Sequence, residues 1–439
     1  MRKLEEKFPR ELVVIGVHSA KFTNEKDSDN IRKAVMRHEI RHPVVNDADF
    51  KIFKAFGARG WPHFVLIDPE GNIVGQAGGE GIYDAFEKAI AKVVDAADKK
   101  KTLDRREIVF KVEEEKTPSL RFPGKVAATA DLLFISDTGH HRIVVADHSG
   151  QVKDVYGSGT PGLQDGDGAS ARFNQPEGLC VRNQELFVAD TENHVIRRID
   201  LKDKRVTTIA GTGKQVYGEK SGEAKVVPLN SPWDVLARGE TLFIAMAGNH
   251  AIWALDLAKG TIGPFAGDGR ETLEDGPHRQ ASFNQPSGLA ALGDKLYVAD
   301  SEVSGVRELD LSPQGDTRTI VGTGLFDFGD VDGVGDAARL QHVLHVAAWD
   351  GKLLVADAYN HKIKRIDPKT RRVETFLGDG KRGTDDGDKP RLNEPSGLAV
   401  AGDKLFIADT NNHAIRVVDL PAKRVATLMI KDLPAFAPK

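Results

Sequence analysis

The stretch LFVADTENHVIRRID, residues 186–200, decides the fold, because near-copies of it recur six times along the 439-residue chain. The aspartates that end the copies are spaced by 53, 56, 54, 57 and 52 residues, at Asp147, Asp200, Asp256, Asp310, Asp367 and Asp419. Each copy holds four short apolar runs of strand type. Four strands per unit, repeated about every 50 residues, are typical of a β-propeller blade. The repeats therefore predict a six-bladed propeller over residues 118–439.

One position in the repeat alternates in a way that the other positions do not. Ten residues before its closing aspartate, each copy has a position that we call the inner aspartate, which is Met246 in the third copy and aspartate in the other five. Twelve residues before this position, the second, fourth and sixth copies carry Gly178, Gly288 and Gly397. The first, third and fifth copies carry Lys125, Asp234 and His345. This position begins the innermost strand, beside the central channel, so we expect the three polar side chains to converge there from alternate blades.

Two interpretations of this polar cluster stay open from the sequence. It lines a pocket at the channel mouth, together with Trp233 and His342 from the preceding loops, and binds a small anionic or peptide carboxylate group. Alternatively, it is a salt-linked plug that fills the propeller axis.

The first hundred residues have a different pattern, in which short β-branched runs alternate with amphipathic stretches. We predict strands over residues 12–18 and 44–45, a hairpin over 63–75, and helices over 24–41, 49–56 and 80–97. Asp27 or Ser28 is the expected cap of the first helix. These elements define an α/β domain over residues 1–98. A basic linker over 99–117 follows, in which residues 107–112 (EIVFKV) either add a strand where the propeller closes or cap the linker.

Composition narrows the classes of function. The formal net charge is −4 and residues 107–439 hold more acidic than basic side chains, which argues against a nucleic-acid-binding propeller. No apolar run approaches the ~18 residues that a membrane span needs. The single cysteine, Cys180, excludes an internal disulfide or a Cys-x-x-Cys pair within this chain. We expect a cytoplasmic protein without a cofactor or a metal site.

Several recurrent polar groups are explained by the blade itself. Asn-His pairs end most second strands, where we expect Asn to take left-handed backbone and His to bond the neighbouring copy. A metal-dependent lyase site built from these histidines is the competing interpretation. Asp-Gly loops near residues 165–168, 332–333 and 385–388 lack the spacing of a calcium loop and are predicted to be turns. Basic residues seven positions after the inner aspartates are predicted to form blade-edge ion pairs of small value, at Arg197, Arg307, Lys364 and Arg416.

Residues 118–430, with their recurring Asn-His turns, resemble NHL repeats. Residues 1–98 resemble a thioredoxin-like domain, because Trp61-Pro62 stands directly before a strand, where that fold places its cis-proline, and a hairpin and terminal helix follow. Together with VVIGVHSAKF and HPVVND, the chain is similar to the NHL repeat-containing protein 2 family. The fold that this resemblance implies is a partial thioredoxin-like α/β domain followed by a six-bladed NHL β-propeller.

The chain departs from the thioredoxin pattern at one point. Residues 1–9 read as the tail of the helix that carries the reactive cysteines in that family, so the central strand and the Cys-x-x-Cys segment are expected upstream of Met1. A truncated start or a degenerate domain both fit this pattern. Without the central strand, the strands at 12–18 and 63–68 are expected to stay unbridged, with exposed backbone edges.

The sequence supports three hypotheses of function. The first is a binding or scaffold protein, whose propeller face holds a protein, a peptide or a small polar ligand and whose thioredoxin-like module is redox-inactive. The second is a relative of thiol-disulfide oxidoreductases whose catalytic cysteines lie upstream. The third and weakest is a propeller lyase or hydrolase that uses His345 and Asp234.

Overall fold

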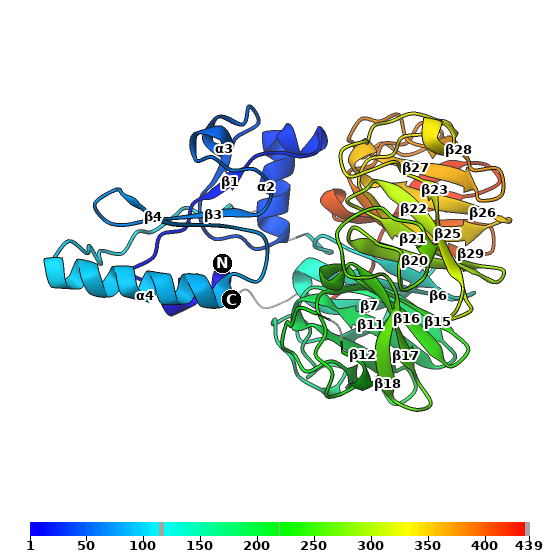
Figure 1. Ribbon diagram of the computed structural model, residues 1–439. Coiled ribbons are helices and arrows are strands. Elements are labelled where there is room, and N and C mark those ends of the chain that lie inside the picture. Colours follow the sequence, from blue (N-terminus) through cyan, green and yellow to red (C-terminus); the bar gives the residue numbers. More distant parts are fainter. Residues whose placement is uncertain (114–117, 219, 435–439) are drawn as a thin grey trace. The chain divides into compact units, whose positions relative to one another are not determined.

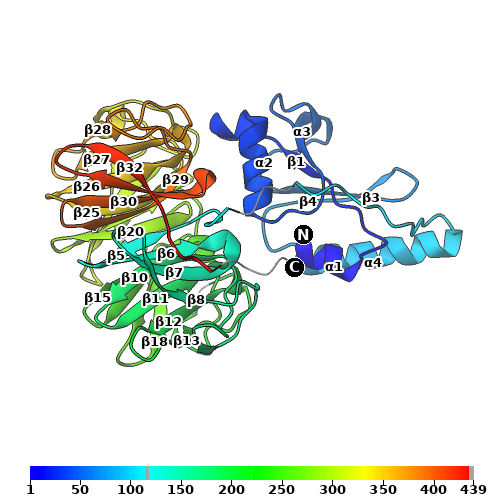
Figure 2. The same cartoon turned by 180° about the vertical axis from the view of Figure 1, so that it is seen from behind.

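The computed structural model of the chain describes residues 1–113, 118–218 and 220–434. The chain divides into two compact units, Met1–Lys116 and Thr117–Lys439 (Figures 1 and 2). In the described residues, no helix is both long and apolar enough to cross a membrane.

The first unit, called the α/β unit below, contains four helices and four strands in its described residues. The helices are α1 (Arg2–Lys7), α2 (Ser28–Arg37), α3 (Lys51–Ala55) and α4 (Tyr83–Lys100), with a 3-10 turn at Asn24–Lys26. The strands are β1 (Gly16–His18), β2 (Val44–Asn46), β3 (His63–Ile67) and β4 (Ile73–Gly78). The side chain of Asp27 accepts from the amides of Asp29 and Asn30, so Asp27 is the helix cap.

The strands of the α/β unit form two separate sheets, as the sequence predicts. β1 pairs in parallel with β2, and β3 pairs antiparallel with β4, but no ladder joins the two pairs within the described residues. The predicted strand over residues 12–18 is shorter than expected, because only residues from Gly16 onward have a pairing strand. The predicted helix over 24–41 ends at Arg37, and Glu39 then takes a left-handed φ of 51°.

A small apolar cluster holds the α/β unit together. Leu4 of α1, Leu66 of β3 and Phe86 and Ile90 of α4 are buried against one another. The cluster lies on the side of the β3–β4 hairpin. Several apolar side chains of β1 and of the residues before it remain exposed instead, among them Val13, Ile15 and Val17.

The second unit is a six-bladed propeller of antiparallel sheets (Figures 1 and 2). Blades 1 and 2 consist of β5 (Val126–Ala128), β6 (Leu132–Asp137), β7 (Arg142–Asp147), β8 (Val152–Tyr156), and of β10 (Pro176–Arg182), β11 (Glu185–Asp190), β12 (Val195–Asp200), β13 (Arg205–Ala210). Blades 3 and 4 consist of β15 (Pro232–Arg238), β16 (Thr241–Met246), β17 (Ala251–Asp256), β18 (Thr261–Ala266), and of β20 (Pro286–Leu292), β21 (Lys295–Asp300), β22 (Gly305–Asp310), β23 (Asp316–Val321). Blades 5 and 6 consist of β25 (Val343–Trp349), β26 (Lys352–Asp357), β27 (Lys362–Asp367), β28 (Arg372–Leu377), and of β29 (Pro395–Ala401), β30 (Lys404–Asp409), β31 (Ala414–Asp419), β32 (Arg424–Leu428).

Blades 2 to 5 each gain a short fifth strand from the preceding interblade loop. These strands are β9 (Gly166–Asp167), β14 (Gly222–Glu223), β19 (Gly276–Pro277) and β24 (Gly333–Val334), and each pairs with the outermost strand of its blade. In blade 6 a single bridge from Gly387 to Val425 takes their place. Each interblade loop is therefore anchored at its middle.

The ring closes by contact between blade 6 and blade 1. The Thr410 hydroxyl donates to the Pro123 carbonyl at 2.8 Å, and the Phe122 amide donates to His413 Nδ1 at 3.0 Å. The segment after β32 lies along the outer strand of blade 1, where the Lys431 amide donates to the Gly150 carbonyl at 2.8 Å. In Figure 2 this last segment runs from β32 toward the first blade. Residues 107–113 belong to the α/β unit and form no strand, whereas 114–117 lie outside the described residues.

Apolar cores fill the spaces between neighbouring blades. Six buried clusters are found, and each joins residues of two adjacent blades, including one that joins Val126 and Leu133 of blade 1 to Phe406 and Ala408 of blade 6. Every blade is thus covered on both faces by its neighbours, which is how a closed ring avoids exposed sheet surface.

Candidate functional site: the propeller axis

Asp234 and His345 lie in direct contact at the axis, although they come from blades 3 and 5. His345 Nε2 is 3.1 Å from Asp234 Oδ2, and both side chains are buried. His345 Nδ1 accepts from the Leu398 amide at 3.1 Å, so the ring proton resides on Nε2 and is donated to Asp234. Burial lowers the pKa of His345, and Lys125 nearby lowers it further, in keeping with a neutral ring.

Lys125 completes the axial cluster from blade 1. Its ammonium donates to the carbonyls of Leu344 in blade 5 and Ser396 in blade 6, the latter at 2.9 Å. Burial lowers the pKa of Lys125 to about 8, although Asp234 and Glu177 oppose this shift. The other Asp234 contact is the amide of Leu289 in blade 4, which donates to Oδ2 at 2.7 Å. The three side chains thus link five of the six blades.

The glycines of the alternate blades provide the space for these side chains. A Cβ at Gly178 would lie 2.4 Å from the Cα of Asp234, and one at Gly288 would lie 2.6 Å from the Cα of His345. At Gly397 it would lie 2.7 Å from the Cα of Lys125. Each glycine therefore faces the polar residue of the following blade, and the alternation in sequence is a packing requirement.

The geometry of the cluster favours the plug over the pocket. Asp234 and His345 are hydrogen-bonded to each other, and all three side chains are hydrogen-bonded to backbone groups of other blades. Charge-assisted hydrogen bonds of this kind contribute about 1.5–3 kcal/mol each. Whether the cluster also binds a carboxylate stays a prediction.

Trp233 and His342 do not join the axial contacts among the described residues. Trp233 is half-buried and sits at the irregular step between Pro232 and Asp234 in β15. His342 stacks on Tyr359 with ring centroids 4.2 Å apart, and its amide donates to the Ser304 hydroxyl at 3.0 Å. Both lie where an interblade loop enters an inner strand. We call the surface made by the interblade loops and the turns after the second strands the loop face.

The prediction that these basic residues form ion pairs of small value at the blade edge is wrong in location. The ion pairs exist, but the basic side chains lie inside the blades. Arg197 is fully buried, and its guanidinium donates to the buried Asp190 at 2.8 Å and to Asp165 at 2.9 Å. Asp190 also accepts from the Asn174 amide at 2.8 Å, which fixes the end of the interblade loop. Burial raises the pKa of Asp190 to about 6 against the opposing effect of Arg197. Arg307 and Arg416 occupy equivalent positions.

Blade 3 has neither partner of this buried ion pair. Met246 stands where the other blades have aspartate, and Trp253, seven residues later, stands where blades 2, 4 and 6 have arginine. Both are buried and belong to one apolar cluster. In blade 3 an apolar pair therefore replaces both partners of the buried ion pair.

The Asn-His turns differ from the expected arrangement in one respect. His, not Asn, takes the left-handed backbone, with φ of 52° at His194 and 55° at His413. The Asn193 amide group donates to Asp190 at 2.8 Å and to the Gly162 carbonyl at 2.8 Å. His194 Nδ1 accepts from the amide of Ser231 in the next blade at 3.1 Å, as the sequence predicts.

The remaining candidate groups have structural contacts. Asp165 accepts from the Thr208 amide and hydroxyl, at 3.0 and 2.8 Å, which makes its loop a turn. Groups of three or more potential metal ligands are absent from the described part of the chain. Burial raises the pKa of the Cys180 thiol to about 11, and the Ala237 amide donates to its sulfur at 3.1 Å.

In the α/β unit, the Trp61–Pro62 peptide bond is cis. The Trp61 indole packs on Phe53 with centroids 5.4 Å apart and donates to the Ser19 carbonyl at 2.9 Å. The Ser19 hydroxyl in turn donates to Asp47 at 2.8 Å. Trp61 and Pro62 therefore lie next to the end of β1.

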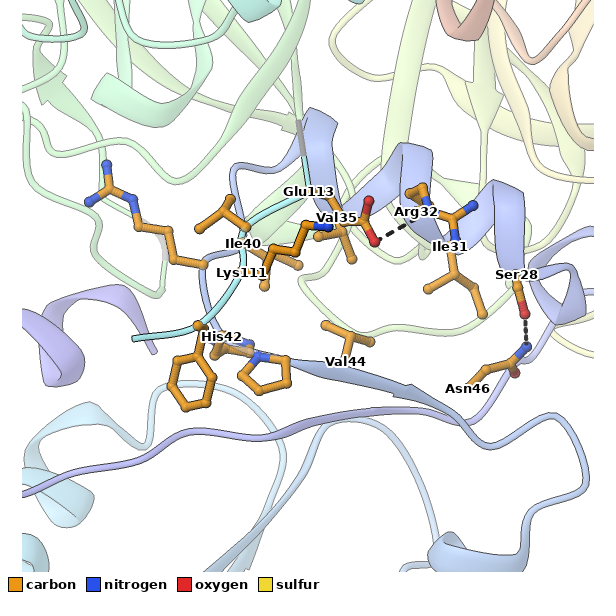
Figure 3. Close-up of a pocket in the computed structure, with 14 residues that line it drawn as sticks. Ser28, Ile31, Arg32, Val35, Ile40, His42, Val44, Asn46, Lys111 and Glu113 are labelled. Atoms are coloured by element: carbon orange, nitrogen blue, oxygen red, sulfur yellow. Dashed lines mark hydrogen bonds and ion pairs between the residues drawn. The ribbon is translucent and has the colours of Figure 1, made fainter. Parts of the chain in front are cut away.

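Figure 3 shows a cavity of this unit, of about 420 Å³, between α2, β2 and residues 110–113. Arg32 and Glu113 pair across it at 3.3 Å, and Asn46 donates to the Ser28 hydroxyl at 3.0 Å. The segment that leads out of the unit thus runs beside the outer edge of β2. Sequence reasoning left the role of this segment undecided.

Comparison with known proteins assigns the class. The NHL repeat pattern matches residues 173–199 and 392–418, in blades 2 and 6. The solved structure titled "Streptogramin B lyase structure" has a TM-score of 0.45 and 12% identity, over 71% of this chain and 84% of that chain. The second unit is an NHL-repeat β-propeller.

Relatives extend the match over both units. The chain is 42% identical to NHL repeat-containing protein 2 of Homo sapiens, over 95% of this chain and 63% of the relative. It is also 42% identical to Protein SUPPRESSOR OF QUENCHING 1, chloroplastic, of Arabidopsis thaliana, over 99% of this chain and 44% of the relative. Over 95% of its length the chain is similar to NHL repeat-containing protein 2, and it spans less than two thirds of the length of these relatives.

Proposed function

We propose that this chain is a binding and scaffold protein whose propeller holds a protein, a peptide or a small polar ligand on its loop face. The observation that carries the proposal is the saturated axis. Asp234, His345 and Lys125, the groups that a propeller lyase or hydrolase would need, are buried and engaged with five blades. A rigid ring with variable loops is suited to recognition rather than to proton transfer at its centre.

The loop face offers half-buried aromatic groups for such contacts. The His342–Tyr359 stack and Trp233 lie where interblade loops meet inner strands, and Phe326 projects from the loop between blades 4 and 5. Amphipathic aromatic side chains of this kind dominate binding energies at protein interfaces.

A photo-crosslinking amino acid placed at Trp233 tests the proposal, with the same probe at Asp294 as the control. Asp294 lies in an exposed turn between the first and second strands of blade 4. The proposal predicts one defined cross-linked species from position 233, competed by unlabelled protein, whose purified form binds the chain in calorimetry. The same species from both positions, or none from either, contradicts it.

A second candidate is thiol–disulfide exchange by a longer protein that includes this chain. Cys180 is only partly buried, but its pKa is raised to about 11, so thiol chemistry would need cysteines in the additional length of the relatives. An insulin-reduction assay distinguishes the two candidates. This chain and its Cys180→Ser variant should be equally inactive, and activity in a full-length relative would support thiol chemistry for the family.

A further inference from the structure

A cavity of about 310 Å³ lies between blades 1 and 2, and we call it the interblade cavity. Its walls include Phe134 and Val145 of blade 1, which are buried, and Val181 and Leu201 of blade 2, which pack against the same apolar cluster. The turns after the first strands of both blades line it as well. Because the loop face is built from the turns after the second strands, the interblade cavity opens at the opposite end of the blades.

Tyr156, in the outermost strand of blade 1, supplies an unused hydroxyl to this cavity. Its side chain is only 1% exposed and belongs to the cavity lining, and its hydroxyl makes no hydrogen bond with any of the described residues. Burial raises the pKa of Tyr156 to about 12, with Asp154 and Asp200 contributing, so the hydroxyl keeps its proton and can donate or accept. A buried hydroxyl without a partner is costly, and a ligand in the cavity would give it one.

Blade 4 shows how another blade uses the equivalent positions. The Tyr297 hydroxyl donates to Glu308 at 2.8 Å, and Glu308 pairs with Arg318. By strand register, the counterparts in blade 1 are Phe134, Val145 and Asp154. Two of these are apolar, so blade 1 has no polar network at this place and offers apolar walls instead.

The charges of the lining disfavour an ionic ligand. Asp154 pairs with Lys204, and Lys153 pairs with Asp147 at 2.8 Å. Both charged side chains of the lining are thus neutralised within the chain, and an added ion would face apolar walls without a counter-charge. Water would give the Tyr156 hydroxyl a partner but would leave the apolar walls wetted. An uncharged molecule with an apolar body and one polar group satisfies both.

We propose that the interblade cavity binds a small uncharged aromatic molecule whose hydroxyl or carbonyl oxygen hydrogen-bonds to the Tyr156 hydroxyl, as a phenol or an aryl ketone would. Phe134 and Tyr156 supply ring surfaces against which an aromatic body packs. The volume is at the lower end of the range of about 300–1,000 Å³ for small-molecule sites, which limits the ligand to one or two rings. The site does not use the loop face, so it stands independently of the proposed function.

The test compares two probes of nearly equal shape on the whole chain, 2-naphthol and naphthalene, of which only the first carries a hydroxyl. Equilibrium dialysis measures the affinity of each. The variant Tyr156→Phe keeps the ring and removes the hydroxyl. Tyr217→Phe is its matched control, because Tyr217 is 46% exposed in the loop between blades 2 and 3, outside the cavity.

The proposal predicts saturable binding of 2-naphthol, about fivefold tighter than that of naphthalene, which corresponds to about 1 kcal/mol for one hydrogen bond. Tyr156→Phe should remove this preference and leave the affinity for naphthalene unchanged, and Tyr217→Phe should change neither. Because the comparison of the two probes uses the unaltered chain, it holds even if Tyr156→Phe fails to fold. Equal affinities for the two probes, or no saturable binding of 2-naphthol, overturn the proposal. A preference for 2-naphthol that survives in folded Tyr156→Phe also overturns it.

Discussion

The propeller and the α/β unit differ in how their sheets are covered. Each blade is covered by its neighbours, and blade 6 returns to blade 1 through Thr410 and His413. The α/β unit holds two separate pairs of strands, with exposed Ile15, Val17 and Ile67 between them. In a closed ring each repeat is covered by the next, so the sheets cover one another. In a non-repeating sheet, each strand edge needs a particular neighbouring strand.

The same difference extends to polar groups. In the propeller, Asp190, Asp234 and His345 are buried and bonded on several sides. In the α/β unit, the polar groups at the open edges are backbone amides and carbonyls directed into an apolar cavity. The polar groups of the propeller are therefore bonded within the ring, whereas the free edges of β1 and β3 pair with no further strand among the described residues.

The largest effect is expected from breaking a buried ion pair in the propeller. Asp190→Ala leaves the fully buried Arg197 without its buried carboxylate partner, with only the half-exposed Asp165 remaining, and should cost about 3 kcal/mol in the free energy of unfolding. Asp203→Ala, in an exposed turn of the same blade, should change it by less than about 0.5 kcal/mol. Urea denaturation followed by tryptophan fluorescence measures both, and equal effects would refute the role of the pair.

A glycine substitution compares the two units directly. Gly178→Val introduces a Cβ 2.4 Å from the Cα of Asp234 and should cost about 3 kcal/mol, because backbone must move. Gly60→Ala in the α/β unit meets no atom within 4 Å and should leave the melting temperature nearly unchanged. Calorimetry of both variants measures the melting temperature. An unchanged melting temperature for Gly178→Val would contradict a tightly packed axis.

The axial histidine gives a smaller effect that depends on pH. His345→Leu removes one hydrogen bond from the buried Asp234 and leaves the Leu398 amide without its acceptor, and it should cost about 2 kcal/mol at pH 8. The pKa of His345 is lowered in the folded state, so the unfolded chain binds a proton first as pH falls below 6.5. The stability that neutral His345 provides is thus present above pH 6.5 and is lost as pH falls toward its folded pKa.

The measurement is the difference in unfolding free energy between the two proteins at pH 8 and pH 5.5. This difference should shrink at the lower pH. A difference that grows on acidification would mean that His345 is charged in the folded protein.

The smallest expected effect concerns the reactivity of the single thiol, Cys180, which lies in the propeller. Burial raises the pKa of Cys180 to about 11 from a usual value of 9.0, so its thiolate fraction at pH 8 falls by about 100-fold. Ellman's reagent should react at least that much more slowly with the native chain than with the chain in urea. Similar rates in both conditions would show an accessible, reactive Cys180.

The propeller could be predicted in detail because its evidence is repeated. Six copies with constant internal spacing place Lys125, Asp234 and His345 at one position of the blade, and the structure brings them together at the axis. The sequence alone predicts the wrong place for the internal ion pairs. A basic residue in a strand is expected to be exposed unless its buried aspartate and the loop that contacts it are both known. Arg197 illustrates this, because besides Asp190 it contacts three residues that lie 25 to 33 positions away.

In the α/β unit, element types follow the sequence but boundaries do not. The strand over residues 12–18 shrinks to β1 because pairing, rather than β propensity, decides where a strand exists. Val17 and Val65, on two strands distant in sequence, line one cavity of about 520 Å³, which periodicity alone does not specify.

Native-state hydrogen exchange of individual amides tests the central claim most directly. The amides of Leu289 and Leu398, which donate to Asp234 and His345 at the axis, should exchange only through global unfolding of the propeller. The amides of Val17 and Val65, at the open edges, should exchange at close to unprotected rates in the same sample. Equal strong protection at all four positions would contradict an open α/β unit, and rapid exchange at Leu289 and Leu398 would contradict the locked axis.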